Sequence, residues 1–450
     1  MGIRIKRVAV LGAGVMGQGI AAHLANAGIP SYLFDVAPQE LTDAESQAGL
    51  TLESREVRNR IATAGVSAMQ KAKPALLYLP DLVSLVNPCN YEDDVDKLAE
   101  CDWIVEVVVE RMDIKQRVFA MVDEHRKRGS VVSSNTSGLS AEAMAEGRSE
   151  DFRRHFMVTH FFNPVRYMRL LEMVPIDDTD PEVFADMARF GEHVLGKGIV
   201  YCKDTPNFIA NRIGTFGMTS VFHWMEQYGV GVAEVDVVFG PAMGRPKSAV
   251  FRTADIVGLD TMAHVLATIG EGCPDDPWRD RFEVPAAMQA LIDDGRLGSK
   301  SGAGFYKKVK TEGGSTILSL DLDTLNYIDA GKIRLAAVGA ARKLEDTGDK
   351  IAAMAAFEDD YGRFAWKVTA ETSIYALELL GQIADDIVNI DRALRWGFNY
   401  ELGPFEAWDA IGVADSVERM RAEGMSVPDA VDRLMEVGEG SWYVKRDGVR

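Results

Sequence analysis

Cysteine is scarce in this chain of 450 residues, which contains four cysteines. They are Cys89, Cys101, Cys202 and Cys273, with no CxxC pair and no His–Cys cluster among them. This pattern argues against a disulfide framework and against a zinc site, so no metal is expected. Free thiols are typical of a reducing compartment, and the sequence therefore favours a cytoplasmic protein.

Basic residues are also fewer than acidic ones: the chain has 49 Lys and Arg and 68 Asp and Glu, which gives a net charge of −19. Binding to nucleic acid depends on neutralising phosphates, so we expect no nucleic-acid partner. No apolar run approaches the ~18–20 residues of a transmembrane helix, so no membrane span is expected. The hydrophobic content of 47% is that of a globular chain. Its length predicts two to four domains of roughly 150 residues.

The first 200 residues alternate short apolar segments with helical ones. The expected strands are 7–11, 31–34, 103–109, 130–133 and 157–162. The expected helices are 15–27, 42–73, 114–126 and 140–146, of which the charged segment 42–73 is expected to project beyond the sheet. Such alternation predicts a parallel sheet covered by helices on both faces.

A glycine-rich loop joins the first expected strand to the first expected helix. Its GxGxxG pattern consists of Gly12, Ala13, Gly14, Val15, Met16 and Gly17. In such loops the glycines allow a tight turn, close approach of a pyrophosphate and packing of helix on strand. Asp35 ends the next strand, where a carboxylate accepts hydrogen bonds from ribose hydroxyls. No arginine follows Asp35, so NAD is favoured over NADP as the cofactor.

One histidine lies near the end of an apolar strand, where a satisfied core residue is the more common interpretation. Glu172 is the lone acid of the next apolar run, and a turn at Asn163-Pro164 can fold it back beside His160. Burial of both groups is costly unless they pair. A carboxylate on one imidazole nitrogen leaves the other as a general base, which favours a catalytic His160.

Ser137 follows another strand, in the segment SSNTSG. Ligands of open α/β sheets gather at the carboxyl ends of the strands, so its hydroxyl is a candidate substrate ligand. An N-cap of the next helix is the alternative role, and the two can coexist.

The β character fades after about residue 204, and helical patterns cover 208–228, 232–239, 260–268 and 286–293. A polar segment at 307–316 is the best candidate for a linker, and a second helical block runs from 322 to about 422. We therefore expect domains at 1–203, 204–308 and 322–450, joined across a linker at 309–321.

The second helical block resembles a degenerate copy of the first. Asp236 and Asp255 are each followed by glycines, and the same pattern recurs at Asp391 and Asp409. The offsets are 155 (391 − 236) and 154 (409 − 255) residues. Order and spacing are both kept, which favours duplication over coincidence.

Several motifs together resemble the L-3-hydroxyacyl-CoA dehydrogenase family of fatty-acid β-oxidation. They are GAGVMG, VEVVVER, SSNTSGLS, THFFNPV, LLEMVP, CKDTPNFIANR and GRLGSKSGAGFYK, in order from residue 1 to about 308. The resemblance implies an α/β Rossmann-type NAD-binding domain followed by two all-α dehydrogenase C-terminal domains. It also implies NAD-dependent oxidation of (S)-3-hydroxyacyl-CoA to 3-ketoacyl-CoA.

The resemblance also implies roles for particular residues. His160 is the catalytic base, Glu172 orients it, and Ser137 and Asn211 hydrogen-bond the reacting oxygen of the substrate. Positions that line the NAD site in the family correspond to Asp35, Glu110, Lys115, Asn163 and Lys300. The chain departs from the family at Gly138, where Ser is common, and at Asn207, where Gly is common. The second copy has no counterpart of Asn211-Arg212, so we expect it to be structural.

Two other functions fit part of the same pattern. An NAD-dependent dehydrogenase of small free hydroxy acids or sugar acids shares the loop and the sheet, and so does a non-catalytic NAD-binding scaffold.

For an acyl-CoA substrate, Arg55 and Arg58 in the charged segment are candidates to flank the CoA adenosine end. The second copy is expected to replace a partner subunit, giving an internal pseudo-dimer and a monomer in solution. A hydratase domain or partner, as in multifunctional relatives, is expected only outside these residues.

Overall fold

A computed structural model of the chain describes residues 3–311, 314–437 and 440–444. The chain divides into two compact units, Met1–Thr205 and Pro206–Arg450, so the first boundary lies within two residues of the expected one. Among the described residues, no helix has both the length and the apolar character needed to cross a membrane.

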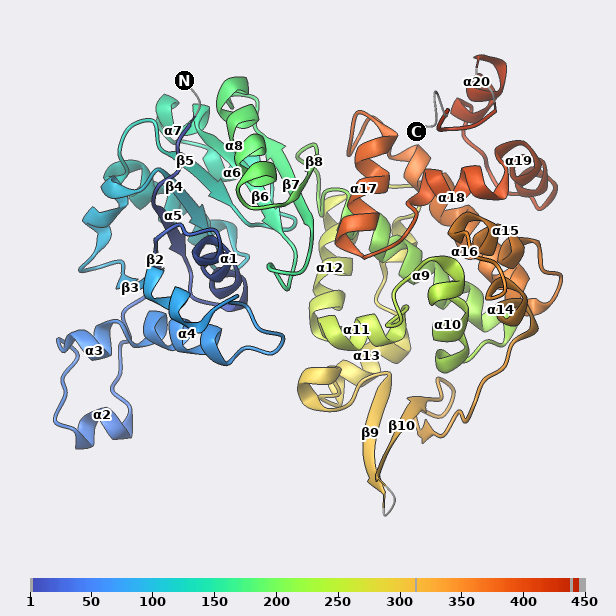
Figure 1. Ribbon diagram of the computed structural model, residues 1–450, viewed down its shortest axis with the longest axis horizontal. Helices are drawn as coiled ribbons and strands as arrows, with labels where there is room; N and C mark the ends of the chain where they lie inside the picture. The colour runs from blue at the N-terminus through green and yellow to red at the C-terminus, as the bar shows by residue number, and fades with distance from the viewer. Residues whose placement is uncertain (1–2, 312–313, 438–439, 445–450) are drawn as a thin grey trace. The chain divides into compact units, whose positions relative to one another are not determined.

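The first unit is built on one sheet of eight strands in the order β3-β2-β1-β4-β5-β6-β7-β8 (Figure 1). The strands are β1 (Val8–Leu11), β2 (Ser31–Asp35), β3 (Val86–Asn90), β4 (Trp103–Glu106), β5 (Val131–Ser134), β6 (Phe156–Phe161), β7 (Leu170–Pro175) and β8 (Gly198–Tyr201). All neighbours are parallel except β6 and β7. The predicted parallel sheet is confirmed, while β3 and β8 were not expected, and the residues of β7 were expected only as an apolar run.

Helices cover both faces of this sheet, as predicted. One face packs on α1 (Val15–Asn26), α4 (Arg60–Lys71) and α8 (Pro181–His193), which share a core with Val10 and Val105. The other carries α5 (Met112–His125), α6 (Ala141–Ala145) and α7 (Glu150–Arg154). There Phe119, Phe152 and Phe156 pack ring against ring. The alternation of side chains along buried strands supplies both faces with apolar groups.

The expected helix over 42–73 is wrong as a single element. The segment contains α2 (Asp43–Gln47), α3 (Arg55–Arg58) and α4. Thr42 and Glu45 form a capping box that starts α2, and Gly49 follows its end at φ +73°. Left-handed backbone at a glycine is a common way to stop a helix, which explains the break.

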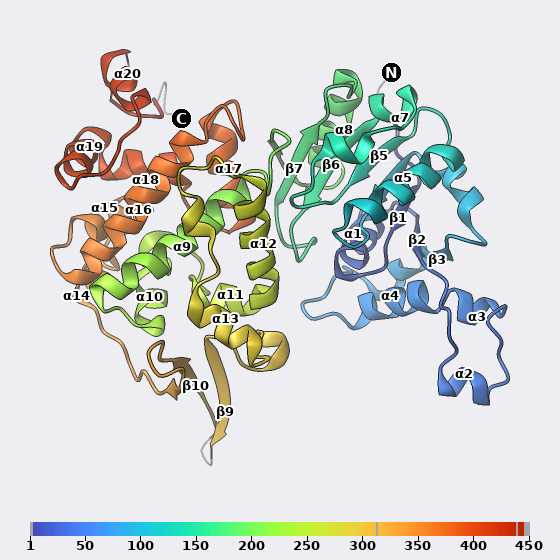
Figure 2. The ribbon, with the colours of Figure 1, turned by 180° about the vertical axis from the view of Figure 1, so that it is seen from behind.

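The second unit is mainly helical (Figure 2). Its helices are α9 (Ala210–Tyr228), α10 (Val232–Val238), α11 (Phe251–Val257), α12 (Leu259–Gly272), α13 (Ala286–Asp293), α14 (Ala336–Ala341), α15 (Thr347–Ala356), α16 (Asp360–Glu378), α17 (Ile387–Gly397), α18 (Pro404–Ile411), α19 (Val413–Ala422) and α20 (Ala430–Val437). The two longest, α9 and α16, pack against each other, with Phe216 stacked on Tyr375 at 4.0 Å between ring centroids.

The segment expected as a linker is instead a β-hairpin, so the second unit is not all helical. Strands β9 (Tyr306–Thr311) and β10 (Gly314–Leu320) pair antiparallel, and β11 (Tyr327–Ile328) adds a short third strand. Val309 is flanked by lysines in β9, whereas Ile317 and Leu318 are adjacent in β10, between polar residues. A hairpin with so many polar positions has the composition of a linker, which explains the wrong expectation.

Candidate functional site

The glycine loop lies between the end of β1 and the start of α1. A Cβ added at Gly12 would lie 2.5 Å from the Val107 carbonyl oxygen, and one at Gly17 only 1.8 Å from that of Gly12. These two glycines are therefore required by close packing. A Cβ on Gly14 would meet nothing within 4 Å, so open space lies beside the N-terminus of α1. That space, next to unpaired helix N–H groups, fits a pyrophosphate.

Asp35 ends β2 and is held against the same loop. Its Oδ2 accepts a hydrogen bond from Ala13 N at 2.7 Å, and its Oδ1 accepts one from Val36 N at 2.8 Å. These contacts fix a carboxylate beside the space at Gly14, where the ribose of a dinucleotide lies in this type of fold. The residues present therefore fit NAD.

His160 and Glu172 face each other across the antiparallel pair β6–β7. Nδ1 of His160 lies 2.7 Å from Oε2 of Glu172, and both side chains are buried. The predicted contact is confirmed. A carboxylate at Nδ1 selects the tautomer that carries its proton there, so Nε2 is the basic nitrogen. The pair has the arrangement of a general base with its orienting acid.

A buried ionic cluster lies at the end of β4, which is separated from β6 by β5. Nζ of Lys115 contacts Oε1 of Glu106 at 2.8 Å and Oε2 of Glu110 at 3.1 Å. Burial raises the pKa of Glu106, although the ammonium group of Lys115 acts in the opposite direction. Burial also opposes ionisation of Glu110, but Lys115 and the Thr136 hydroxyl outweigh it and lower the pKa of that carboxyl. Glu110 also accepts from Ser137 N at 3.1 Å, so Lys115 anchors the loop that carries Ser137.

Sequence analysis did not identify two residues of this region, Glu106 in the cluster and Asn135 beside it. Glu106 is fully buried in β4, and the signal that identified Glu172, a lone acid in an apolar strand, applied to it as well. Asn135 accepts a hydrogen bond from Phe161 N at 2.9 Å and so ties the end of β5 to the end of β6 beside His160. No sequence signal marks that contact.

The alternative role of Ser137 as a helix cap is wrong. The N-cap of α6 is Ser140, whose hydroxyl accepts a hydrogen bond from Ala143 N. Asn163 lies exposed in the turn that follows β6.

Asn211 and Lys300 belong to the second unit. Asn211 is the second residue of α9, and the adjacent Arg212 is buried, with Nε donating to the Tyr375 hydroxyl at 2.6 Å. Arg212 also pairs with Asp276. The first turn of α9 is thus held by a residue of α16. Lys300 is half exposed and pairs with Asp260 at 2.6 Å.

Asn207, where the family commonly has glycine, has φ +61°. That left-handed conformation favours glycine, and asparagine is among the few other residues that adopt it readily. Asparagine at this position therefore tolerates the backbone conformation that the structure shows.

The two arginines expected near CoA differ in their surroundings. Arg58 pairs with Glu92 at 2.6 Å and with Asp93 at 2.5 Å, so its charge is already compensated. The side chain of Arg55 is 75% exposed and lies 3.9 Å from Asp94. Arg55 is therefore the better placed of the two to bind a phosphate.

The doubly wound sheet, with its glycine loop and its paired histidine and glutamate, defines a Rossmann-type dehydrogenase. Residues 7–205 match the NAD-binding domain of 3-hydroxyacyl-CoA dehydrogenase, and residues 208–308 match its C-terminal domain. A probable 3-hydroxyacyl-CoA dehydrogenase of Deinococcus radiodurans is 46% identical over 310 residues, 69% of this chain and 85% of the relative. The chain belongs to the 3-hydroxyacyl-CoA dehydrogenase family, whose N-terminal domain binds NAD.

A longer relative matches almost the whole chain. The probable 3-hydroxyacyl-CoA dehydrogenase of Bacillus subtilis is 50% identical over 444 residues, 99% of this chain. The chain spans only 56% of the length of that relative. The crystal structure of 3-hydroxybutyryl-CoA dehydrogenase from Escherichia coli shares the fold, with a TM-score of 0.65 at 23% identity, covering 94% of this chain and 96% of that one.

Proposed function

We propose that the chain oxidises (S)-3-hydroxyacyl-CoA to 3-ketoacyl-CoA with NAD, as a step of fatty-acid β-oxidation. The observation that carries the proposal is the buried His160–Glu172 pair, 2.7 Å between Nδ1 and Oε2, in a unit whose glycine loop fits NAD. An NAD-binding scaffold has no need of such a pair.

When bound, NAD supplies the hydride acceptor. Nε2 of His160 takes the proton of the substrate hydroxyl, and Glu172 stabilises the imidazolium that forms. Ser137 and Asn211 hydrogen-bond the same oxygen and orient the reacting carbon, because hydride transfer depends on geometry. Through Glu110, Lys115 keeps the Ser137 loop in position.

The same proposal assigns the remaining residues to binding. Residues 12–17 hold the pyrophosphate, Asp35 holds the adenosine ribose, and Glu110, Lys115, Asn163 and Lys300 complete the NAD site. Arg55, with Arg58 in a lesser role, flanks the CoA phosphates.

A substrate comparison tests the activity. We expect the chain to oxidise NADH with acetoacetyl-CoA and to leave free acetoacetate almost unchanged at equal concentration. Turnover of the free acid at an equal or higher kcat/KM would favour a dehydrogenase of small hydroxy acids. If no CoA ester of any acyl length is turned over, the proposal is refuted.

We further propose that the helical C-terminal domain is duplicated. In the first half, Asp236 accepts hydrogen bonds from backbone N–H groups of residues 250–252 and from the Tyr306 hydroxyl at 2.9 Å. Asp255 accepts from the backbone N–H groups of Phe305 and Tyr306, both at 2.8 Å.

The second half repeats this network. Asp391 accepts from the backbone N–H groups of residues 405 and 406 and from the Tyr443 hydroxyl at 2.7 Å. Asp409 accepts from those of Trp442 at 2.7 Å and Tyr443 at 2.9 Å. Two aspartates, an aromatic pair, a tyrosine hydroxyl and two of the three backbone donors to the first aspartate recur in the same order, which supports duplication.

The packing of α9 on α16 supports an internal pseudo-dimer, because the second half then covers the face that a partner subunit would occupy. Sedimentation equilibrium should give mainly a 49.4 kDa monomer. A dimer at micromolar concentration would contradict the pseudo-dimer and leave the second half as an appended domain.

A further inference from the structure

Arg212 follows Asn211 in the first turn of α9 and is tied to residues of both halves of the second unit. Its Nε donates to the Tyr375 hydroxyl at 2.6 Å, and its Nη1 lies 2.6 Å from Sγ of Cys273. Arg212 also forms an ion pair with Asp276. Of these three partners, Tyr375 belongs to α16. The residue next to the proposed substrate ligand is therefore held in part by the second half.

The Tyr375 hydroxyl links the two charged groups of this cluster. It accepts from Arg212 and donates to Oδ2 of Asp276 at 2.7 Å. Tyr375 is fully buried, and the side chain of Asp276 is 1% exposed. Burial raises the pKa of the Tyr375 hydroxyl above its usual value, so the hydroxyl keeps the proton that it donates. Hydrogen bonds to charged groups are strong in such an interior, so the orientation of Arg212 depends on this hydroxyl.

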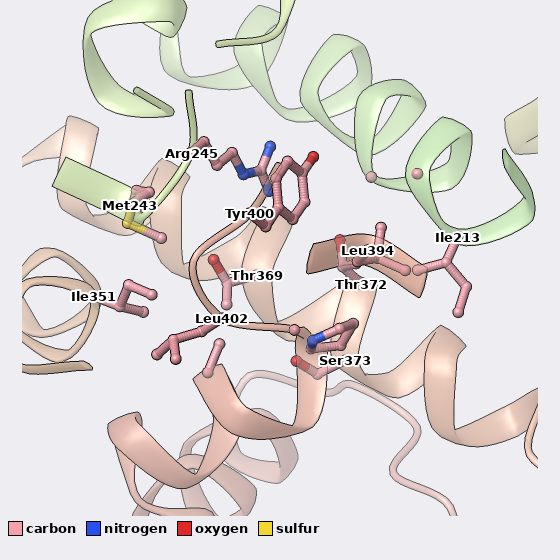
Figure 3. Close-up of a pocket in the computed structure, with 15 residues that line it drawn as sticks. Ile213, Met243, Arg245, Ile351, Thr369, Thr372, Ser373, Leu394, Tyr400 and Leu402 are labelled. Carbon is pink, nitrogen blue, oxygen red and sulfur yellow. The ribbon is translucent and has the colours of Figure 1, made fainter. Parts of the chain in front are cut away.

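The start of α9 is packed closely against the second half. Phe216 stacks on Tyr375, and a Cβ added at Gly214 would lie 2.2 Å from Cζ of Phe398. Ile213 lines a pocket together with residues of α16 and α17 (Figure 3). Close-packed interiors transmit small displacements, so a change at Tyr375 is expected to move the first turn of α9.

We propose that Tyr375 of the second half is a positioning residue for the substrate site: through Arg212 it fixes the first turn of α9 and with it Asn211. The inference rests on the proposed function, because it takes Asn211 as the ligand of the reacting oxygen. A displacement of about 1 Å can cost roughly 10²-fold in rate, because hydride transfer depends on geometry. Loss of one hydroxyl should therefore lower the rate although Tyr375 itself does not touch the substrate.

Tyr375→Phe removes the hydroxyl and keeps the ring that stacks on Phe216. With acetoacetyl-CoA and NADH, we expect kcat/KM to fall about tenfold while KM for NADH stays within about twofold. Asn211→Ala removes the group that is positioned, so adding Tyr375→Phe to it should cause less than about a twofold further loss. Multiplicative losses in the double variant, or kcat/KM unchanged in Tyr375→Phe, would overturn the proposal.

Tyr361→Phe is the matched control. Tyr361 also lies in α16, at its opposite end, and its hydroxyl also binds the first half, donating to Oε1 of Glu234 in α10 at 2.6 Å. We expect kcat/KM in Tyr361→Phe to stay within about twofold, because the lost bond does not hold the first turn of α9. An equal loss in both variants would show that any weakened contact between the halves lowers activity, and would refute a specific role of Tyr375.

Hydrogen exchange measured by mass spectrometry tests the positioning without turnover. Exchange at residues 210–216 should be roughly fivefold faster in Tyr375→Phe and unchanged in Tyr361→Phe, because local opening follows the contacts that are lost. Unchanged exchange at 210–216 in Tyr375→Phe would refute the anchoring of Asn211. If the unmodified chain reduces no 3-ketoacyl-CoA, the proposed function fails, whereas the exchange result still decides whether Tyr375 holds the first turn of α9.

Discussion

The two halves of the second unit share a hydrogen-bond network but differ where the substrate is expected. Asp236 and Asp391 make matching contacts, whereas α16, the long helix of the second half, contains no Asn-Arg pair like Asn211-Arg212 of α9. Trp366 Nε1 and Lys367 Nζ both contact Glu423, at 3.0 and 2.7 Å. The aspartate contacts that stabilise each half are therefore separate from the residues proposed to bind the substrate.

Among substitutions outside His160, loss of the orienting acid should give the largest effect. Glu172→Gln keeps the size of the side chain, but an amide neither stabilises an imidazolium nor fixes the tautomer of His160. We expect kcat to fall by roughly 10²–10⁴. Steady-state kinetics with acetoacetyl-CoA and NADH measure it, with Glu182→Gln, an exposed acid at the start of α8, as the control. Rates within twofold of the unmodified chain would remove Glu172 from the chemistry.

The comparison of the two halves predicts that the long helices α9 and α16 respond unequally to substitution. Asn211→Ala should lower kcat/KM by about 10²–10³, the usual cost of one lost hydrogen-bond donor to a reacting oxygen. Lys367→Ala, in the second half, should change it less than twofold. Similar losses in both variants would contradict the division into a chemical half and a structural half.

The aspartate network should respond in stability. Asp391→Asn turns an amide N–H toward donors, so we expect the free energy of unfolding to fall by roughly 1–3 kcal/mol, with kcat unchanged. Asp236→Asn should give a similar loss. Urea unfolding measures both, and a loss in one half only would argue against equivalent networks.

The same aspartates predict a pH dependence. Burial raises the pKa of Asp236 to about 6 and of Asp391 to about 7, from a usual value of 3.8. The folded state therefore favours the protonated acids, so their contribution to stability is complete below about pH 4 and is lost as pH rises to about 7. Asp391→Asn should flatten the fall in unfolding free energy between these limits. An unchanged pH profile would show that Asp391 does not titrate there.

The smallest effect is expected at the CoA end. Charge reversal in Arg55→Glu should raise KM for acetoacetyl-CoA several-fold and leave that for an acetoacetyl-pantetheine thioester unchanged, because only CoA carries the adenosine phosphates. Arg58→Glu should act similarly but more weakly, since two acids already compensate Arg58. Equal changes with both thioesters would refute docking of CoA at α3.

Local signals made much of the first unit predictable. The glycine loop follows from GxGxxG between a strand and a helix, and the contact of His160 with Glu172 follows from the cost of burying either alone. Contacts that depend on how distant elements cross were not predictable. Lys115 contacts Glu106 only because α5 packs against the sheet near the end of β4. The sequence around neither residue predicts this contact.

The second unit shows where composition misleads. The hairpin of β9 and β10 is polar on much of its surface, so its sequence has the character of a linker. By contrast, the proposed repeat was predicted from the spacing of four aspartates alone, because each has to lie next to the backbone N–H groups that it binds. Spacing is informative where a side chain serves a fixed backbone feature.

His160 is the proposed base in the oxidation of 3-hydroxyacyl-CoA. The most direct measurement is kcat for acetoacetyl-CoA reduction by NADH in His160→Gln, with NADH affinity followed separately by fluorescence. We expect kcat to fall by about 10²–10⁴ while NADH affinity stays within twofold. A kcat within twofold of the unmodified chain would contradict it.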